Sequence, residues 1–397
     1  GSTTALPNNY GVSISGDGNL NIAGNTVSIG SGVASITGSG TSSIQNTGSS
    51  TATFTAASYS IATNNAATIS AILAGSTSTL TMSGPGTLTL SGTNTYAGGT
   101  TVSAGTLSVN STNNLGGSTR ALTLAGGTLS LGTNGSSYTI ANPITLSANS
   151  TITNVGTSTV TMTGGIVGAG KALTIAGTGA LTFSTGVISG ASTSIVQNNS
   201  NTVTFSGNNT YTGSTTVTAG TLAAGVSTLG TSYGAFGVGS NITVNGGTLA
   251  LGAYNESVGT VTIGSSGGSI TGSGTLTATT SYTFNNTSSA TISAILAGTG
   301  VTLTQAGAGT TTLSNANTYS GNTTINTGGV LVASAAGNFG TGTLVFNGGN
   351  LNLTTGAANF TLSNAISLLS NAAITNNGTT TATFSGAITS GNAQTNT

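Results

Sequence analysis

The stretch LSGTNTYAGGTTVSAGTLSV, Leu90 to Val109, contains no charged residue, no cysteine and no histidine. Close variants of this stretch recur around Tyr211 and Tyr319. Aliphatic or aromatic residues alternate with small polar residues beside each copy, as in TLTL at Thr87 to Leu90. An alternation with a period of two residues predicts short strands that have one buried side and one solvent-facing side.

Corner signals separate the expected strands. Gly-Gly, Asn-Gly, Asn-Asn and Ser-Gly pairs tolerate the positive φ angles that tight corners need. Gly105, Gly220 and Gly328 occupy the same place in the three copies of the motif, so we predict a structural role for them. No segment carries a convincing helical pattern.

Charge is almost absent from the chain. Of 397 residues, 65 are glycine and only 1% are charged, with a formal net charge of zero. Without electrostatic repulsion between molecules, self-association is expected. Two isolated cations cannot form a nucleic-acid surface, and no apolar run is long enough to span a membrane as a helix. The four charged residues are Asp17, Arg120, Lys171 and Glu256.

Internal similarity gives the long-range organisation. The string ATISAILAG occurs at residues 67–75 and again at 290–298, an offset of 223 that also separates Tyr96 from Tyr319. Nine consecutive identities in step with a second marker make chance a poor explanation. We predict one continuous solenoid over residues 1–397, with motif copies near residues 86–107, 203–222 and 311–331.

Many short strands, no helices and an inherited repeat favour an all-β parallel β-helix over a sandwich, because a solenoid grows by adding coils. Aliphatic side chains are expected to stack inside coils spaced about 4.8 Å apart. Threonine suits the outer side, since its β-branch favours extended backbone and its hydroxyl meets water.

The motif resembles a known family. GTLTLSGTNTYAGGTTVSAGTL, Gly86 to Leu107, is similar to the autotransporter-associated β-strand repeat, also called the passenger-associated transport repeat. Residues 203–222 resemble it equally well, and residues 311–331 more weakly. The resemblance implies a right-handed β-helix of roughly 16 to 20 coils in a secreted or cell-surface bacterial protein.

No residue pattern predicts a catalytic, cofactor or metal site. Asp17 and Glu256 are too far apart in sequence to suggest a paired acid and base, and each is predicted to be an exposed turn charge. Lys171 lacks the spacing of a phosphate loop and is predicted to lie at a solvated corner. The hydroxyl side chains have no histidine to activate them, so no enzyme is predicted.

The recurrent aromatic and amide residues of the motif have two interpretations. Tyr96, Tyr211 and Tyr319 form either an aromatic binding stripe or corner side chains packed on the next coil, and packing is the preferred interpretation. Asn94, Asn209 and Asn317 are assigned structural positions beside them.

Threonine arrays on β-solenoids can order water and bind ice. Such a face needs Thr-x-Thr pairs at one place on many coils, whereas the pairs here are unevenly spaced in sequence, so ice binding is not predicted. The pairs are Thr79/Thr81, Thr87/Thr89, Thr159/Thr161, Thr202/Thr204, Thr260/Thr262 and Thr302/Thr304.

The sequence therefore favours a structural, extracellular, self-assembling subunit of a fibre, sheath or surface stalk. Its predicted partner is itself, in end-to-end or lateral contact. The alternative is an autotransporter-type passenger that acts as an adhesin or spacer, with cell-surface or glycan contacts. Neither hypothesis involves nucleic acid, membrane insertion by this segment or a cofactor.

Overall fold

The computed structural model describes residues 4–5, 10–48, 51–132, 135–230, 233–354 and 359–391. It is an all-β parallel β-solenoid of about 17 turns, which confirms the predicted fold class. Within the described ranges no α-helix occurs, and a short 3-10 helix, η1, spans Ala336–Phe339. The right hand implied by the resemblance stays a prediction.

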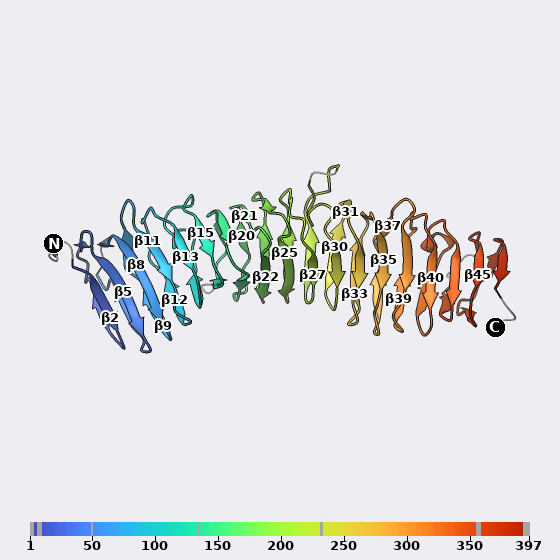
Figure 1. Cartoon of the computed structure of the whole chain (residues 1–397), viewed down its shortest axis with the longest axis horizontal. Helices are drawn as coiled ribbons and strands as arrows, with labels where there is room; N and C mark the ends of the chain where they lie inside the picture. Colours follow the sequence, from blue (N-terminus) through green and yellow to red (C-terminus); the bar gives the residue numbers. More distant parts are fainter. Residues whose placement is uncertain are drawn as a thin grey trace. The chain divides into compact units, whose positions relative to one another are not determined.

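The chain divides into two compact units. Unit 1 comprises Gly1–Ser194 and Asn199–Asn201, and unit 2 comprises Ile195–Asn198 and Thr202–Thr397. Each unit is built from successive coils whose strands stack in parallel on those of the coil before (Figure 1). The predicted continuity of the solenoid over the whole chain stays a prediction.

Unit 1 has two long sheets, which we call sheet 1 and sheet 2, and a third side with shorter runs of strands. Sheet 1 consists of β2 (Val12–Ser15), β5 (Val33–Gly38), β8 (Ser58–Thr63), β11 (Thr79–Met82), β13 (Thr100–Val102), β15 (Leu122–Leu124), β18 (Ile144–Leu146), β21 (Ile166–Val167) and β24 (Ile188–Ser189). Sheet 2 consists of β3 (Asn19–Asn21), β6 (Ser42–Gln45), β9 (Ala66–Ile69), β12 (Thr87–Leu90), β14 (Thr106–Val109), β16 (Thr128–Leu131), β19 (Ser150–Asn154) and β22 (Ala172–Gly177). The third side holds β1 (Thr4–Ala5), β4 (Val27–Ser28), β7 (Thr53–Thr55), β10 (Ile72–Ala74), β17 (Tyr138–Ile140), β20 (Val160–Met162) and β23 (Leu181–Phe183).

Unit 2 repeats this plan with sheets 3 and 4. Sheet 3 consists of β25 (Ser194–Asn199), whose central residues belong to unit 2, β27 (Thr215–Val217), β29 (Ile242–Val244), β32 (Val261–Ile263), β35 (Ser281–Phe284), β38 (Thr302–Gln305), β40 (Thr323–Asn326), β42 (Leu344–Asn347), β45 (Ile366–Leu368) and β48 (Ile388–Ser390). Sheet 4 consists of β26 (Thr202–Phe205), β28 (Thr221–Ala224), β30 (Thr248–Gly252), β33 (Gly268–Gly272), β36 (Ala290–Ile292), β39 (Thr310–Leu313), β41 (Val330–Ala333), β43 (Asn350–Leu353) and β46 (Ile374–Asn376). The third side holds β31 (Glu256–Val258), β34 (Thr275–Ala278), β37 (Ile295–Ala297), β44 (Phe360–Leu362) and β47 (Ala382–Phe384).

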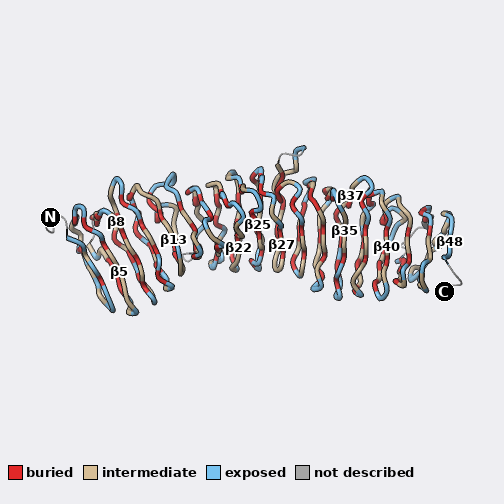
Figure 2. Tube along the Cα trace, viewed as in Figure 1, coloured by how far each residue is buried: buried red, intermediate tan, exposed pale blue. Residues whose placement is uncertain are grey.

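Inward side chains form columns that run from coil to coil. In sheet 2, Leu88 pairs with Leu107, Leu107 with Leu129, and Leu129 with Ile152, and all four side chains are fully buried. Figure 2 shows the resulting alternation of buried and more exposed positions along the strands of both units. Burying one such aliphatic side chain contributes about 1.5–3 kcal/mol, so these columns supply the main stabilisation of each coil.

Outward threonines form columns as well. In sheet 3 the middle residues of six successive strands are threonines in direct register, and each is partly exposed. They are Thr216, Thr243, Thr262, Thr283, Thr304 and Thr324. Their uneven sequence spacing reflects corners of different length, so uneven spacing does not exclude a regular ladder. The Thr-x-Thr pairs themselves are spread over several sheets in both units, and ice binding stays untested.

The 223-residue offset corresponds to equivalent places in the two units. Tyr59 of β8 and Tyr282 of β35 are both buried, and their hydroxyl oxygens lie 2.7 Å from the carbonyl oxygens of Ala74 and Ala297 respectively. The rings of Tyr59 and Tyr282 pack at 6.3 and 6.0 Å, centroid to centroid, against Tyr96 and Tyr319. The long repeat therefore preserves individual contacts as well as strands.

Candidate functional site

The three motif copies build the same corner. Tyr96, Tyr211 and Tyr319 are all fully buried, which is incompatible with an exposed binding stripe. Each tyrosine lies on a stretch without a strand, just before a strand of sheet 1 or sheet 3. Each hydroxyl pairs with the threonine four residues later, Thr100, Thr215 or Thr323, at 2.7 Å. These buried threonines stand where a strand would otherwise carry an aliphatic residue, and they satisfy the tyrosine hydroxyls.

The asparagine two residues before each tyrosine ties neighbouring coils together. Asn94 accepts a hydrogen bond from Leu73 N–H at 2.8 Å and donates one to Asn114 C=O at 2.6 Å. Asn317 makes the equivalent bonds with Leu296 and Asn338, also at 2.8 and 2.6 Å. Asn209 donates to Ala235 C=O at 2.6 Å. Asn94 and Asn317 thus each link their own coil to the coils on both sides.

The predicted corner glycines take the left-handed conformation. Gly105, Gly220 and Gly328 have φ angles of 67°, 51° and 81°. A side chain would strain the backbone at these positions, which explains why glycine recurs there.

The outer two copies share a buried amide on the next coil. Asn114 accepts hydrogen bonds from the backbone N–H groups of Asn110 and Ser111, both at 2.9 Å, and donates to Gly92 C=O. Asn338 does the same with Ser334, Ala335 and Asn315. Both side chains are fully buried. We call these two side chains the amide caps.

The middle copy has an insertion instead of an amide cap. Gly237 follows Tyr211 by 26 residues, whereas Gly116 and Gly340 follow Tyr96 and Tyr319 by 20 and 21, and all three glycines lie against the carbonyl of their tyrosine. The additional residues fall within 226–234, where the structure describes 226–230 and 233–234. This described part, which we call the inserted segment, leaves the line of the coils near β31 (Figure 1). Ala235 occupies the position that corresponds to the amide caps.

A buried carboxyl group replaces the missing amide. Glu256 is 1% exposed, and its Oε2 accepts hydrogen bonds from Thr228 Oγ1 at 2.8 Å and from Ala235 N–H at 3.1 Å. Its other oxygen, Oε1, has no partner among the described residues. Burial raises the pKa of Glu256 to about 7, and the donors that face its carboxyl group, Thr228 Oγ1 and the backbone N–H groups of Ala235 and Phe236, oppose that shift.

The prediction that Glu256 is an exposed turn charge is wrong. Glu256 begins β31, where its side chain faces inward together with that of Val258, while Ser257 between them is partly exposed. The sequence could have predicted this burial, because Glu256 lies two residues before the apolar Val258 and alternate residues of a strand face the same side. The insertion that makes room for a carboxyl group could be recognised only by comparing the three copies.

The other charged residues lie in unit 1. Asp17 is exposed in a turn, as predicted, and accepts a hydrogen bond from Thr41 N–H at 2.8 Å. Arg120 is exposed, and Lys171 lies partly buried beside a turn. Among the described residues, no three acidic, histidine or cysteine side chains gather into a metal-binding group.

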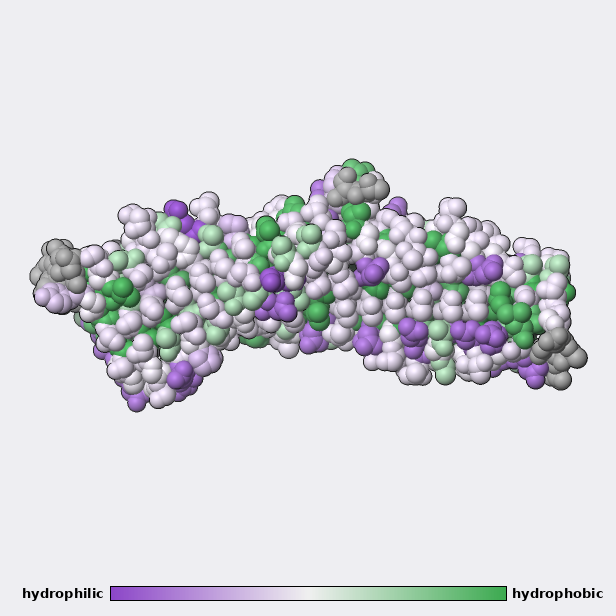
Figure 3. All heavy atoms as spheres, in the orientation of Figure 1, coloured by the Kyte–Doolittle hydropathy of each residue, from purple (hydrophilic) through white to green (hydrophobic). Residues whose placement is uncertain are grey.

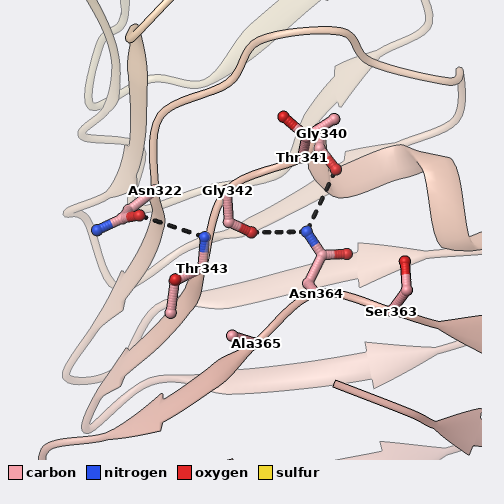
Figure 4. A pocket seen from close by; sticks show the side chains of 8 residues that line it. All are labelled: Asn322, Gly340, Thr341, Gly342, Thr343, Ser363, Asn364 and Ala365. Atoms are coloured by element: carbon pink, nitrogen blue, oxygen red, sulfur yellow. Dashed lines mark hydrogen bonds between the residues drawn. The ribbon is translucent and has the colours of Figure 1, made fainter. Parts of the chain in front are cut away.

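A polar groove of about 300 Å³ opens beside the third motif copy. Asn322 Oδ1 accepts from Thr343 N–H at 3.2 Å on one side, and on the other Asn364 donates to the carbonyls of Gly340 and Gly342 at 3.2 and 2.7 Å (Figure 4). The lining side chains are amides and hydroxyls, so the groove offers hydrogen bonds without charge. The remaining lining residues are Thr341, Ser363 and Ala365.

At the equivalent place in unit 1 the asparagine is more deeply buried. Asn142 donates to Gly117 C=O and Arg120 C=O as Asn364 does to Gly340 and Gly342. However, Asn142 is only 1% exposed, and its Oδ1 is buried without a partner among the described residues. Four residues separate Gly116 from Ala121 there, against two between Gly340 and Thr343, so the groove accompanies a shorter corner.

Comparison with known proteins assigns the motif. A family model described as the passenger-associated-transport-repeat matches residues 80–109, 195–224 and 303–333. The chain carries passenger-associated transport repeats in three places. We number them repeats 1 to 3, and we refer to the cap or insertion that follows each match together with its repeat. No curated protein and no solved structure gives a significant match to the chain.

The matched residues coincide with the corners described above. Each match includes the buried asparagine, tyrosine and threonine of one corner. The amide caps and Glu256 lie outside the matches. The chain is therefore a β-solenoid that carries passenger-associated transport repeats at three of its corners. No helix among the described residues has the length and hydropathy needed to cross a membrane.

Proposed function

We propose that this chain is a spacer segment of an autotransporter passenger, which holds other parts of the passenger at a set distance from the cell surface. The observation that supports this role is the coil-to-coil equivalence within each unit. The same inward columns, outward hydroxyls and bridging asparagines recur as coils are added. A segment built in this way gains length without needing new contacts.

The visible surface agrees with a passive role. Its hydropathy is mostly near neutral in Figure 3, because serine, threonine and glycine cover much of it. The segment from residue 195 to the C-terminal residue contains one charged residue, the buried Glu256. Salt and charged polymers are therefore expected to interact only weakly with this surface.

Deleting one long repeat tests the spacer role. Ser58 of β8 and Ser281 of β35 are equivalent, so removing residues 58–280 joins the chain in register. We expect surface display to persist and an N-terminal epitope to move roughly 45–50 Å closer to the cell, the height of about ten coils. Atomic force microscopy on displaying cells measures that height.

The control is a deletion that breaks the register. Removing residues 58–270 joins unlike strand positions and should abolish folded display. An unchanged epitope height in the in-register variant contradicts the spacer role.

The polar groove beside repeat 3 favours an adhesin role as a second candidate. Asn364 is buried except for 8% of its surface, and its two hydrogen bonds to described residues both use Nδ2 and leave Oδ1 available. Together with the neighbouring hydroxyls, this oxygen fits a neutral saccharide with adjacent hydroxyl groups.

Saturation-transfer NMR with glucose, galactose and mannose tests this candidate. We expect saturation transfer that Asn322→Ala weakens and that Asn241→Ala, a control at another corner asparagine, leaves unchanged. No transfer for any of the three sugars opposes this candidate.

Self-assembly and the lack of enzymatic activity remain hypotheses from composition. Sedimentation velocity at increasing concentration tests the first, because a chain with so little charge is expected to associate. A single sedimenting species at high concentration would exclude self-assembly under those conditions. Assays for glycan cleavage test the second.

A further inference from the structure

Glu256 holds both ends of the inserted segment of repeat 2. On the outgoing side, Thr228 donates its hydroxyl to Oε2, and Thr228 Oγ1 accepts from Ser257 N–H at 3.0 Å. On the returning side, Ala235 N–H donates to the same carboxyl oxygen. Backbone hydrogen bonds add to this attachment: Thr228 N–H donates to Asn255 C=O at 2.8 Å, and Gly234 and Asn209 exchange bonds of 3.2 and 3.0 Å. We call this set of contacts the base of the insertion.

The base is packed closely around the carboxyl group. A Cβ atom placed on Gly234 would lie 2.9 Å from Oε2 and 2.3 Å from Thr228 Oγ1, so a larger residue there would displace these two side chains. Oε1 has no partner among the described residues. A negative charge at this place would therefore keep one oxygen without water or donor, which costs far more than burying the neutral acid.

No positively charged side chain belongs to the same unit as Glu256, so none offsets the cost of burying its negative charge. Tyr211 is the titratable side chain that interacts with Glu256, and burial holds its pKa well above its usual range, so it stays neutral. Asp17, Arg120 and Lys171, the remaining charged residues of the chain, all belong to unit 1.

We propose that Glu256 is a proton-operated latch on the inserted segment. The neutral carboxyl group keeps the base closed, and the ionised group opens it because water can then reach Oε1. Opening loosens the outgoing part of the segment, which carries Leu229 with 63% of its surface exposed, while Gly234 stays paired with Asn209. Repeat 2 would thus present this segment differently in acidic and in neutral surroundings, whereas repeats 1 and 3, with amide caps, would not change.

Amide hydrogen exchange of the whole chain tests the latch. The protection factor of Ala235 N–H should fall at least about tenfold between pH 5.5 and pH 8, because the open base ionises more readily than the closed one. In Glu256→Gln the side chain cannot ionise, so protection should stay constant. The amide of Asn338 in repeat 3 should stay constant in both proteins.

Two results would overturn the proposal. One is an Ala235 protection factor that changes with pH equally in the wild type and in Glu256→Gln. The other is an equal loss at Asn338, which would indicate general loosening of the solenoid. If Glu256→Gln does not fold, Thr228→Val serves in its place, and its Ala235 amide should already be poorly protected at pH 5.5.

Discussion

Repeat 2 differs from repeats 1 and 3 in how the next coil is closed. Repeats 1 and 3 place a buried amide, Asn114 or Asn338, where it satisfies two backbone N–H groups and one carbonyl. Repeat 2 places a buried carboxyl group, that of Glu256, against an insertion. The hydrogen bond between tyrosine and threonine is nevertheless the same in all three, and an asparagine precedes each tyrosine by two residues.

This difference separates the fixed part of the repeat from the variable part. The corner contacts the inward columns, where packing tolerates little change. The cap faces a loop that varies in length, so any buried acceptor that reaches the free N–H groups can serve. A solenoid with these repeats can therefore accept an insertion if a neighbouring coil supplies the missing acceptor.

Removing the tyrosine rings should have the largest effect and should not distinguish the repeats. We expect Tyr96→Ala, Tyr211→Ala and Tyr319→Ala each to lower the free energy of unfolding by about 3–5 kcal/mol, because each leaves a large cavity. Urea unfolding followed by circular dichroism measures this. A much smaller loss at Tyr211 would mean that the corner of repeat 2 is not equivalent to the others.

A change of pH should affect repeat 2 alone. The pKa of Glu256 in the folded chain, about 7, is higher than the ordinary glutamate value of 4.5. Between those values the unfolded chain ionises while the folded chain keeps its proton, so stability falls as pH rises and the loss is complete above pH 7. We expect a loss of about 3 kcal/mol that Glu256→Gln removes. Equal pH profiles of the two proteins in urea unfolding argue against a buried, titrating Glu256.

Removing an amide cap should have a smaller effect. Asn338→Ala leaves Ser334 N–H, Ala335 N–H and Asn315 C=O without their side-chain partner, which we expect to cost about 2 kcal/mol. The loss should not depend on pH, in contrast to repeat 2. The matched substitution Asn114→Ala should behave alike, and a pH-dependent loss in either variant contradicts the comparison.

Removing the threonine hydroxyls should have the smallest effect. Thr100→Val, Thr215→Val and Thr323→Val keep the side-chain shape but leave a buried tyrosine hydroxyl without its partner, at a cost of about 1 kcal/mol. Combining Thr215→Val with Tyr211→Phe should restore part of the loss, which a double-mutant cycle measures. A fully additive pair would show that the hydroxyls do not interact.

The sequence predicted the solenoid because the two-residue alternation and the long repeat both reflect the backbone itself. It predicted buried corners at Tyr96, Tyr211 and Tyr319, since a recurrent aromatic at a corner needs a surface to pack on. It missed the partners, such as Thr100 and Asn114, because those contacts join residues four positions or a whole coil apart. It assigned Glu256 to the surface because a charge usually lies there, and only register shows that its strand position faces inward.

Titration of Glu256 itself tests the account most directly. It is the only glutamate in the chain, so labelling glutamate with ¹³C at Cδ gives a single carboxyl resonance in the intact protein. A buried carboxyl group at the base of the repeat 2 insertion predicts a chemical-shift midpoint near pH 7. A midpoint near 4.5, the ordinary value for a solvated glutamate, would contradict the buried carboxyl group and the latch together.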